Sequence, residues 1–143
     1  IELHGTIRIA RCHSCRRECD IHGALSGWNP GEVPECTACG GSLRPAVVWF
    51  GEALPADALL AADRAIRSCD IMLVVGTSGV VQPAASFAYT ASSRGAKVIE
   101  VNPEETPISG IADVVLRGPA AVELPLLMGP GDREDLRSRP RVD

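Results

Sequence analysis

Cys12-His13-Ser14-Cys15 and Cys36-Thr37-Ala38-Cys39 are two C-x-x-C pairs with 20 residues between them. Each pair is typical of a tight turn on which two sulfur atoms converge, and two such turns supply the four thiolates of a tetrahedral zinc site. A closed site of this kind leaves no coordination position for water, so we expect the zinc to stabilise the structure and to take no part in a reaction. The alternative is a set of four ordinary buried cysteines without a metal.

Residues close to the two pairs support a metal site and offer further ligands. Gly40 and Gly41 follow the second pair, and such a turn needs the positive φ that glycine adopts without strain. His13, Cys19 and His22 are spare candidate ligands, although Cys19 would need an irregular loop to reach the metal. The zinc ligands predicted from the spacing are Cys12, Cys15, Cys36 and Cys39.

The composition is that of a globular chain without a strongly basic face. Its 143 residues suffice for one domain with a sizeable core, and 45% of them are hydrophobic. The 14 Lys and Arg residues against 18 Asp and Glu residues give a net charge of −4, which argues against nucleic acid as the main partner. No apolar run is long enough for a membrane span, and no signal peptide opens the sequence. Six cysteines, four of them in zinc spacing, favour a reducing compartment such as the cytoplasm over a disulfide scaffold.

Residues 11–43 form the predicted zinc module, and an α/β pattern follows it. Residues 1–10 are expected to hold the end of a strand and then a turn, and residues 129–143 a mobile tail. The run at residues 70–75 is continuous and apolar, which is typical of a parallel sheet covered on both faces. The expected strands are 44–50, 70–75, 97–101 and 113–116, and the expected helices are 55–67, 83–94 and 119–128, the last bent or interrupted at Pro125.

This order of strands and helices predicts one α/β sheet with right-handed crossovers. Ligands of such sheets bind beyond the carboxyl ends of the strands. The rule gathers four groups of residues along one edge of the predicted sheet, namely His4, residues 50–52, residues 76–78 and Asn102.

The residues at this edge each have a functional and a structural interpretation. Gly76-Thr77-Ser78 presents small residues and N–H groups suited to phosphate or ribose, although many ordinary turns between strand and helix look alike. Asn102 stands where such sheets place a ribose-contacting residue, and Asn is also common at strand ends. His4 suits a general base, although a lone histidine is more often structural. Glu52 could be catalytic or simply solvated. Taken together, the residues alone predict an α/β nucleotide-binding domain stabilised by zinc, and they leave the reaction open.

Taken together, these motifs resemble the sirtuins, which are NAD-dependent protein-lysine deacylases. The matching segments occur in the order of the family and extend over residues 1–128. Trp49, beside the Phe-Gly-Glu segment, is more similar to the bacterial and desuccinylase-type branch than to the others. The segments that carry the resemblance are Glu2-Leu3-His4-Gly5, the two C-x-x-C pairs, Leu43–Glu52, Val75–Ala85, Val101-Asn102 and Gly118-Pro119.

The resemblance implies a fold, a reaction and residue roles. The fold would be a partial Rossmann-like parallel sheet, made by residues 1–10 and 44–128, with the zinc module inserted near its start. In the reaction, the acyl oxygen of the lysine attacks C1′ of NAD, nicotinamide leaves, and the acyl group ends on ADP-ribose. His4 would be the general base that acts on the ribose hydroxyls of the alkylimidate. The residues that match NAD-binding positions are Gly76, Thr77, Ser78, Asn102 and, through its backbone, Ala120.

The resemblance also places the substrate, which is an acylated lysine in a protein or peptide. Val48 would lie near the tunnel for the acyl-lysine. An extended peptide is expected to add as a strand between two segments, a mode in which main-chain pairing supplies the affinity. These segments are Phe50, Gly51 and Glu52 on one side and Val81, Gln82 and Pro83 on the other.

Several parts of the family pattern do not occur in this sequence. The family's Gly-Ala-Gly loop, its arginine-bearing cofactor loop and its Gln-Asn-Ile-Asp segment all precede the catalytic histidine. The sequence opens at Ile1 inside a motif, which indicates a truncation, a processing site or an unrecorded upstream part. The residues that distinguish acetyl from succinyl also lie upstream, so the acyl preference stays open. If the 143 residues were the whole polypeptide, we would expect no turnover of NAD.

Other functions stay open at the level of sequence. A zinc ribbon on an α/β scaffold could bind a protein or nucleic acid without turnover, although a net charge of −4 does not favour a basic binding face. A silent binder of NAD or ADP-ribose would have no need of His4. A transferase that moves ADP-ribose to protein shares the chemistry and is not separated from a deacylase by these residues.

Overall fold

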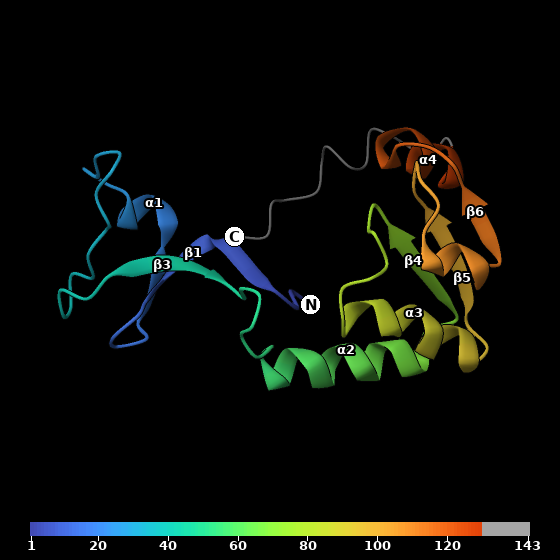
Figure 1. Ribbon diagram of the computed structural model, residues 1–143, viewed down its shortest axis with the longest axis horizontal. Helices are drawn as coiled ribbons and strands as arrows, with labels where there is room; N and C mark the ends of the chain where they lie inside the picture. Colours follow the sequence, from blue (N-terminus) through green and yellow to red (C-terminus); the bar gives the residue numbers. More distant parts are fainter. Residues whose placement is uncertain (130–143) are drawn as a thin grey trace. The chain divides into compact units, whose positions relative to one another are not determined.

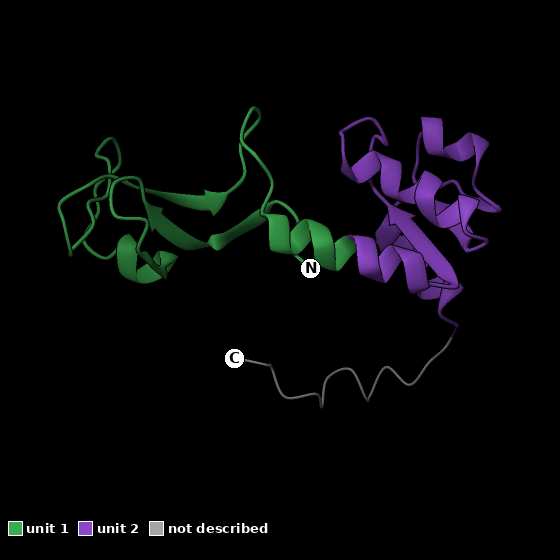
Figure 2. Cartoon of the chain, turned by 90° about the horizontal axis from the view of Figure 1, so that it is seen from below, with its two compact units in different colours: residues 1–62 green, residues 63–143 purple. Residues whose placement is uncertain are grey.

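The computed structural model describes residues 1–129, which divide into two compact units. The first unit comprises residues 1–62, and the second begins at residue 63 (Figure 2). The boundary lies within helix α2 (Ala56–Ser68). From residue 130 onward, the predicted tail lies outside the described residues.

The first unit is built on a three-stranded antiparallel sheet with the order β2-β1-β3 (Figure 1). Residues 1–10 hold a turn followed by a strand, which reverses the predicted order. The alternation in this segment is too weak to show where pairing begins, and pairing with β3 is what defines the strand. The elements are β1 (Gly5–Cys12), β2 (Glu18–Asp20), the four-residue helix α1 (Ile21–Ala24) and β3 (Leu43–Val47).

The pairing of β3 corrects the prediction that residues 44–50 join the parallel sheet. β1 and β3 are antiparallel, with Gly5 opposite Val47. The chain between them turns back on itself through the two C-x-x-C turns, and strands joined in this way run antiparallel, because a parallel pair needs a crossover. The strand also ends at Val47, so the prediction of a buried strand that reaches Phe50 is wrong: the Phe50 side chain is 94% exposed.

The second unit has a three-stranded parallel sheet with the order β4-β5-β6. The strand predicted at residues 97–101 is confirmed with the same bounds, and the other strands and helices predicted after residue 55 are confirmed to within one residue at each end. The last helix runs through Pro125 without a break. After α2, the elements are β4 (Ile71–Val75), α3 (Ala84–Ser93), β5 (Lys97–Val101), the unpredicted 3-10 helix η1 (Pro107–Gly110), β6 (Val114–Leu116) and α4 (Ala120–Leu127).

The helices are short and present small or apolar side chains to the interior. In α2, Ala62 and Ile66 are buried, and Asp63 and Arg67 form an i,i+4 ion pair of 2.6 Å on the exposed side. Such exposed pairs contribute little to stability, so the apolar face is what anchors the helix. Within residues 1–129, no helix has the length and apolar character needed to cross a membrane.

Helix α3 packs against the parallel sheet through a face of alanines. Ala85, Ala88 and Ala91 are buried in this helix. Their small side chains bring the helix backbone close to the sheet, where dispersion contacts are dense. The core cluster that results consists of Val74, Ala88, Val98 and Ile108, with Met72, Ile111 and Ala112 packed against it.

One face of β4 is exposed in the described chain. Ile71, Leu73 and Val75 are 59%, 45% and 37% exposed, whereas Val74 is buried. Successive side chains of a strand point to opposite faces, so only one face of β4 meets the core formed with α3. The prediction of a strand covered on both faces is therefore not met within residues 1–129.

Candidate functional site

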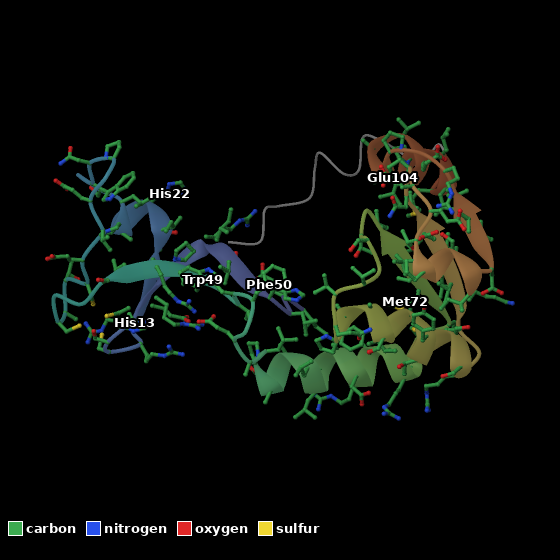
Figure 3. All side chains as sticks on the ribbon, viewed as in Figure 1. His13, His22, Trp49, Phe50, Met72 and Glu104 are labelled. Atoms are coloured by element: carbon green, nitrogen blue, oxygen red, sulfur yellow. The ribbon has the colours of Figure 1, made fainter. Side chains whose placement is uncertain are left out.

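Four cysteine side chains converge in the first unit. The Sγ atoms of Cys12 and Cys39 are 3.5 Å apart, and those of Cys15 and Cys36 are 3.8 Å apart. All four sulfur atoms lie within 4.8 Å of one another. Cys12 is the last residue of β1, so the pairing of this strand with β3 fixes the position of the first turn. The sulfur atoms gather near the labelled His13 in Figure 3.

The donor set fits a four-coordinate zinc ion. Tetrahedral coordination with Zn–S bonds of about 2.3 Å places sulfur atoms about 3.8 Å apart, close to the two shortest separations. The N–H of Cys15 donates to Sγ of Cys12 at 3.4 Å and is the largest influence that lowers the pKa of the Cys12 thiol to about 6. A hydrogen bond from the Gly41 N–H lowers the pKa of the Cys39 thiol. Hydrogen bonds with the Cys12 and Cys15 thiols act in the opposite direction, and the pKa of Cys39 is raised to about 11. The thiolate is the form that binds metal. A cation at this position would therefore replace the protons that the thiols share and would be bound by all four sulfur atoms.

The two glycines after Cys39 shape the second turn in different ways. Gly40 has a φ of 71°, as predicted, and its N–H donates to the carbonyl oxygen of Cys36 at 2.8 Å. Gly41 does not have a positive φ, so that part of the prediction is wrong. Instead, a Cβ at this position would lie 2.5 Å from Oγ of Ser14 and 3.1 Å from Sγ of Cys12. Gly41 therefore allows the close approach of the two turns.

The spare candidate ligands lie outside this cluster. Neither His13 nor His22 nor Cys19 belongs to a metal-binding group among the described residues. Sγ of Cys19 instead donates to the carbonyl oxygen of Ala10 at 3.8 Å. The six cysteines, all within residues 1–129, are free thiols.

His4 lies in the turn before β1, and its side chain is exposed. Its carbonyl oxygen accepts a hydrogen bond from the N–H of Val48 at 2.9 Å, which extends the pairing of β1 with β3. Gly5 follows with a φ of 72°, and a side chain there would collide with the carbonyl oxygen of Ala46. The backbone of His4 is thus fixed beside Val48, while its imidazole stays accessible.

Residues 49–52 form a turn that Glu52 closes. The N–H of Trp49 donates to Oε2 of Glu52 at 3.1 Å, and Nη2 of Arg44 donates to the same oxygen at 2.8 Å. The guanidinium of Arg44 also lies 4.5 Å from the centroid of the Trp49 ring. The hydrogen bond from Arg44, followed by that from Trp49, lowers the pKa of Glu52. The carboxylate is therefore ionised and used to hold the turn, which favours a structural over a catalytic role for this group.

The turn that Glu52 closes presents its other residues outward. Phe50 is 94% exposed, and Gly51 has a φ of 87°. Figure 3 labels Trp49 and Phe50 near the end of β3. The sequence motif identified this segment, but it gave no sign that Arg44 holds it in place.

In the second unit, Asn102 and the turn at residues 76–78 are joined directly. Asn102 is buried, and its Nδ2 donates to the carbonyl oxygen of Thr77 at 2.6 Å. The N–H of Gly76 donates to the carbonyl oxygen of Val101 at 3.0 Å, so the turn continues the pairing of β4 with β5. Gly76, Thr77 and Ser78 are exposed. The two predicted groups therefore meet at the carboxyl ends of neighbouring parallel strands.

Glu100 is a buried residue at this edge that the sequence analysis did not single out. Its carboxylate accepts hydrogen bonds from Oγ1 of Thr106, from Oγ of Ser109 at 2.5 Å and from Nη1 of Arg117 at 3.2 Å. Burial raises its pKa, but the hydrogen bonds from Ser109, Thr106 and Arg117 outweigh burial, and the pKa is lowered. A single acidic residue inside the apolar strand Lys97–Val101 was the signal that could have revealed it.

Arg117 links Glu100 to the predicted cofactor edge. Its Nη1 also lies 3.4 Å from the carbonyl oxygen of Asn102 and donates to that of Glu104 at 2.8 Å. The N–H of Glu104 in turn donates to Oδ1 of Asn102 at 3.1 Å. The side-chain amide of Asn102 is thus held from both ends, which fixes the orientation of the group that supports Thr77.

The remaining predicted residues of the second unit lie at helix starts. Ala120 is the first residue of α4 and is half-buried. Val81 is 43% exposed, and its carbonyl oxygen accepts from the N–H of Ala85 at 2.9 Å. Gln82 is exposed, and Pro83 stands directly before α3.

The candidate residues thus form two groups, one in each unit. The prediction that His4 and residues 50–52 share an edge with residues 76–78 applied the rule for parallel strand ends. That rule does not hold for the first group, because β1 and β3 are antiparallel. It does hold for the turn at residues 76–78 and for Asn102, which follow β4 and β5.

Comparison with known proteins identifies the family. Residues 1–83 match the Sir2 family. The chain belongs to the Sir2 family. Among Sir2-family relatives, NAD-dependent protein deacylase 1 of Archaeoglobus fulgidus is 48% identical over 120 residues, which are 84% of this chain and 48% of the relative. The NAD-dependent protein deacylase of Aquifex aeolicus is 50% identical over 124 residues, which are 87% of this chain and 51% of the relative.

Solved Sir2 structures have the same fold. A complex of a Sir2 homologue with NAD is 47% identical, with a TM-score of 0.76, over 82% of this chain and 45% of that chain. A Sir2 structure with a p53 peptide and NAD+ is 35% identical, with a TM-score of 0.77, over 82% of this chain and 49% of that chain. The predicted fold class, a Rossmann-like α/β fold with a four-cysteine cluster, is confirmed. The chain spans about half the length of the curated relatives that it matches.

Proposed function

We propose that this chain is part of an NAD-dependent protein-lysine deacylase of the sirtuin type. The observation that carries the proposal is the 2.6 Å hydrogen bond from Nδ2 of Asn102 to the carbonyl oxygen of Thr77. This bond holds an exposed, small-residue turn at the carboxyl ends of β4 and β5, where parallel α/β sheets bind nucleotides. The names of the two relatives at 48% and 50% identity support the same reaction.

The NAD-binding residues of this proposal lie in the second unit. The turn at residues 76–78 offers N–H groups and hydroxyls to the phosphate and ribose groups of NAD, and Asn102 orients that turn. Ala120, at the start of α4, contributes through its backbone. The solved Sir2 homologue in complex with NAD supports this assignment.

The catalytic residue of the proposal is His4. In the reaction, the acyl oxygen of the modified lysine displaces nicotinamide from C1′ of NAD, and the acyl group is then transferred to ADP-ribose. A ring nitrogen of His4 accepts the proton of a ribose hydroxyl, which makes that oxygen the better nucleophile toward the acyl carbon. The exposed imidazole on a fixed backbone suits this role, because the ring can approach a ligand without any change at Val48.

The metal of the proposal is a structural zinc ion. Cys12, Cys15, Cys36 and Cys39 would hold it, and all four coordination positions would be filled by sulfur. The ion would cross-link the two turns and would take no part in the reaction. Free thiols at all six cysteines suit a reducing compartment, and we place the enzyme in the cytoplasm.

The substrate of the proposal is an acylated lysine in a protein or peptide. Val48, beside His4, would contact the acyl-lysine side chain, and residues 50–52 would offer main-chain groups to the peptide backbone. Residues 81–83, ahead of α3, would do the same in the second unit. A solved Sir2 structure holds a p53 peptide with NAD+, which supports this substrate class.

Replacement of His4 by Ala tests the proposal. In the polypeptide that carries this chain, His4→Ala is expected to lower acyl-lysine-dependent nicotinamide release by about 10²–10⁴-fold, because a general base contributes that much to the rate. Binding of NAD should be nearly unchanged, since proton removal is not needed in the ground state. His22→Ala is the matched control, because His22 is exposed on α1 and has no role in the proposed reaction.

Three outcomes separate the proposal from its alternatives. Loss of release with retained NAD binding in His4→Ala alone supports deacylation with His4 as the base. NAD binding by the unsubstituted protein, with no release from any acylated peptide, would indicate a silent NAD or ADP-ribose binder. Binding of neither NAD nor ADP-ribose would indicate a zinc-bearing interaction module.

A further inference from the structure

An open hollow of about 630 Å³ lies in the first unit beside the turn that Glu52 closes. Three guanidinium groups and a single carboxylate line it, together with apolar side chains. The hollow therefore carries an excess of two positive charges, although the whole chain has a net charge of −4. The residues that matter below are Arg11, Arg16, Arg44, Val47, Val48 and Glu52.

Two of the three arginines are already paired with carboxylates. Arg11 forms an ion pair of 2.7 Å with Glu18, which does not line the hollow. Arg44 forms an ion pair of 2.8 Å with Glu52 and also donates to the carbonyl oxygen of Val47 at 3.4 Å. Because Glu52 is neutralised by Arg44, it does not repel an anion that enters the hollow.

Arg16 is the arginine that forms no ion pair within residues 1–129, although its charge contributes to lowering the pKa of Glu52. Within residues 1–129 its side chain forms no ion pair and no hydrogen bond, and the residue is exposed. Its guanidinium can therefore offer the full planar fork of donors that matches a carboxylate.

The backbone of Arg16 is fixed by the first C-x-x-C turn. Its φ is 62°, the left-handed region that few residues other than glycine adopt. Its N–H donates to the carbonyl oxygen of Cys12 at 3.1 Å, so the turn that ends at Cys15 sets the position of its Cα. A side chain that starts from a fixed point loses less conformational freedom when it binds a ligand.

The hollow adjoins the segment assigned to the substrate. Val48 and Glu52 line it, and both belong to the stretch that the proposed function places against the acyl-lysine peptide. An anion bound at Arg16 would therefore lie beside residues that the proposed function assigns to the acyl-lysine peptide.

We propose that the hollow binds the carboxylate side chain of an Asp or Glu residue that flanks the acylated lysine, with Arg16 as the residue that selects it. This inference rests on the proposed function and names the substrate class of the same site: acyl-lysine peptides with an acidic residue nearby. Arg11 and Arg44 add to the positive field, while Val47 and Val48, which also line the hollow, would contact the methylene groups of the ligand.

Paired peptides test the inference in the polypeptide that carries this chain. Each pair has the same acyl-lysine sequence with Asp or Asn at one flanking position, and the pairs cover three positions on either side. At one or two positions the Asp peptide is expected to have a KM about two- to fivefold lower, with kcat unchanged, which is the size of a partly exposed ion pair. The ratio should fall toward one as the salt concentration rises.

Two substitutions identify Arg16 as the selecting residue. Arg16→Gln should remove the Asp preference, and Arg16→Glu should reverse it in favour of Asn. Arg17→Gln is the matched control, because Arg17 is also exposed and adjacent in sequence but does not line the hollow. Arg16→Lys, which keeps the charge, should retain part of the preference for Asp. Zinc content and amide exchange of each variant show whether the first unit is folded.

The outcomes separate this inference from the proposed function. Equal KM values for the Asp and Asn peptides at all positions, or the same loss in Arg17→Gln and Arg16→Gln, would overturn it while deacylation stands. If no peptide is turned over, the proposed function fails, and fluorescence polarisation of the same labelled peptides then tests the hollow alone. Salt-sensitive, Arg16-dependent binding of the Asp peptide would support an acid-binding hollow, and its absence would reject it.

Discussion

The two units of this chain are stabilised in different ways. In the first unit, two of the four core members are cysteines of the candidate metal site, Cys12 and Cys36. In the second unit all four core members are aliphatic: Val74, Ala88, Val98 and Ile108. A segment with so small an apolar core depends on a cross-link, whereas a parallel sheet under a helix depends on burial. From this comparison we expect one short chain to combine a metal-dependent part and a packing-dependent part that can be disturbed separately.

Loss of one metal ligand should have the largest effect, and only on the first unit. Cys36→Ser is expected to release zinc and unfold residues 5–47, because binding of structural zinc contributes about 10–16 kcal/mol in small zinc modules. The second unit should keep its slow amide exchange at Val98 and Val101, both fully buried. Metal analysis and hydrogen exchange by mass spectrometry, resolved by unit, provide the measurement.

A cysteine of the second unit provides the control for this experiment. Cys69→Ser changes a free thiol that is outside the four-sulfur cluster, so zinc content should be unchanged. Freshly purified protein without zinc, or equal loss of protection in both units of Cys36→Ser, would contradict the division into a metal-dependent and a packing-dependent part.

Removal of the buried carboxylate should disturb only the second unit, by a smaller amount. Glu100→Ala is expected to lower the free energy of unfolding by about 3–5 kcal/mol, because it leaves the donors of Arg117, Thr106 and Ser109 without their acceptor. Denaturant unfolding gives this change, and zinc content should stay normal. Glu104→Ala is the control, since Glu104 is exposed and contributes only backbone hydrogen bonds to the network. Equal destabilisation by the two substitutions would show that the buried carboxylate has no special importance.

The smallest effect is a dependence on pH that belongs to the second unit. The pKa of Glu100 is lowered from its ordinary value of 4.5, so its contribution to stability is full above that value and is lost as the pH falls through the lower value of the folded state. Glu100→Gln should therefore be less stable than the unsubstituted protein at pH 7, and the difference should shrink below about pH 4.5. Amide exchange at Val98, followed over pH, measures this effect apart from acid release of zinc. A difference that stays constant down to pH 3 would mean that Glu100 does not titrate in this range.

The candidate site could be predicted where a short stretch of sequence is enough to indicate a chemical role. Four cysteines at C-x-x-C spacing needed no knowledge of the fold, since the spacing itself forms the turn. Asn102 and residues 76–78 could be placed together because the ends of neighbouring parallel strands meet at one edge. Cys19 could not be excluded in advance, because its distance from the cluster depends on how β1 and β2 pair.

The contacts that hold the site were not predictable, because they join residues distant in sequence. Glu100 is 9 positions from Ser109 and 17 from Arg117, so no local pattern tells whether its carboxylate will be buried or solvated. Arg44 meets Glu52 across the end of β3 for the same reason. A carboxylate is buried only where its partners are brought within hydrogen-bonding distance, and that is a property of the assembled unit.

By itself, the sequence determined the metal-binding set, the family, and the helices and strands after residue 55. These follow from spacing and periodicity, which act over a few residues and survive without tertiary contacts. Tertiary structure alone decided that β1 and β3 pair antiparallel in a unit of their own, that Phe50 is exposed, and that Arg16 lines a hollow without forming an ion pair in the part of the chain that the structure describes. The direction of strand pairing and the burial of a side chain depend on which distant segments the folded backbone brings together, so composition and spacing cannot specify them.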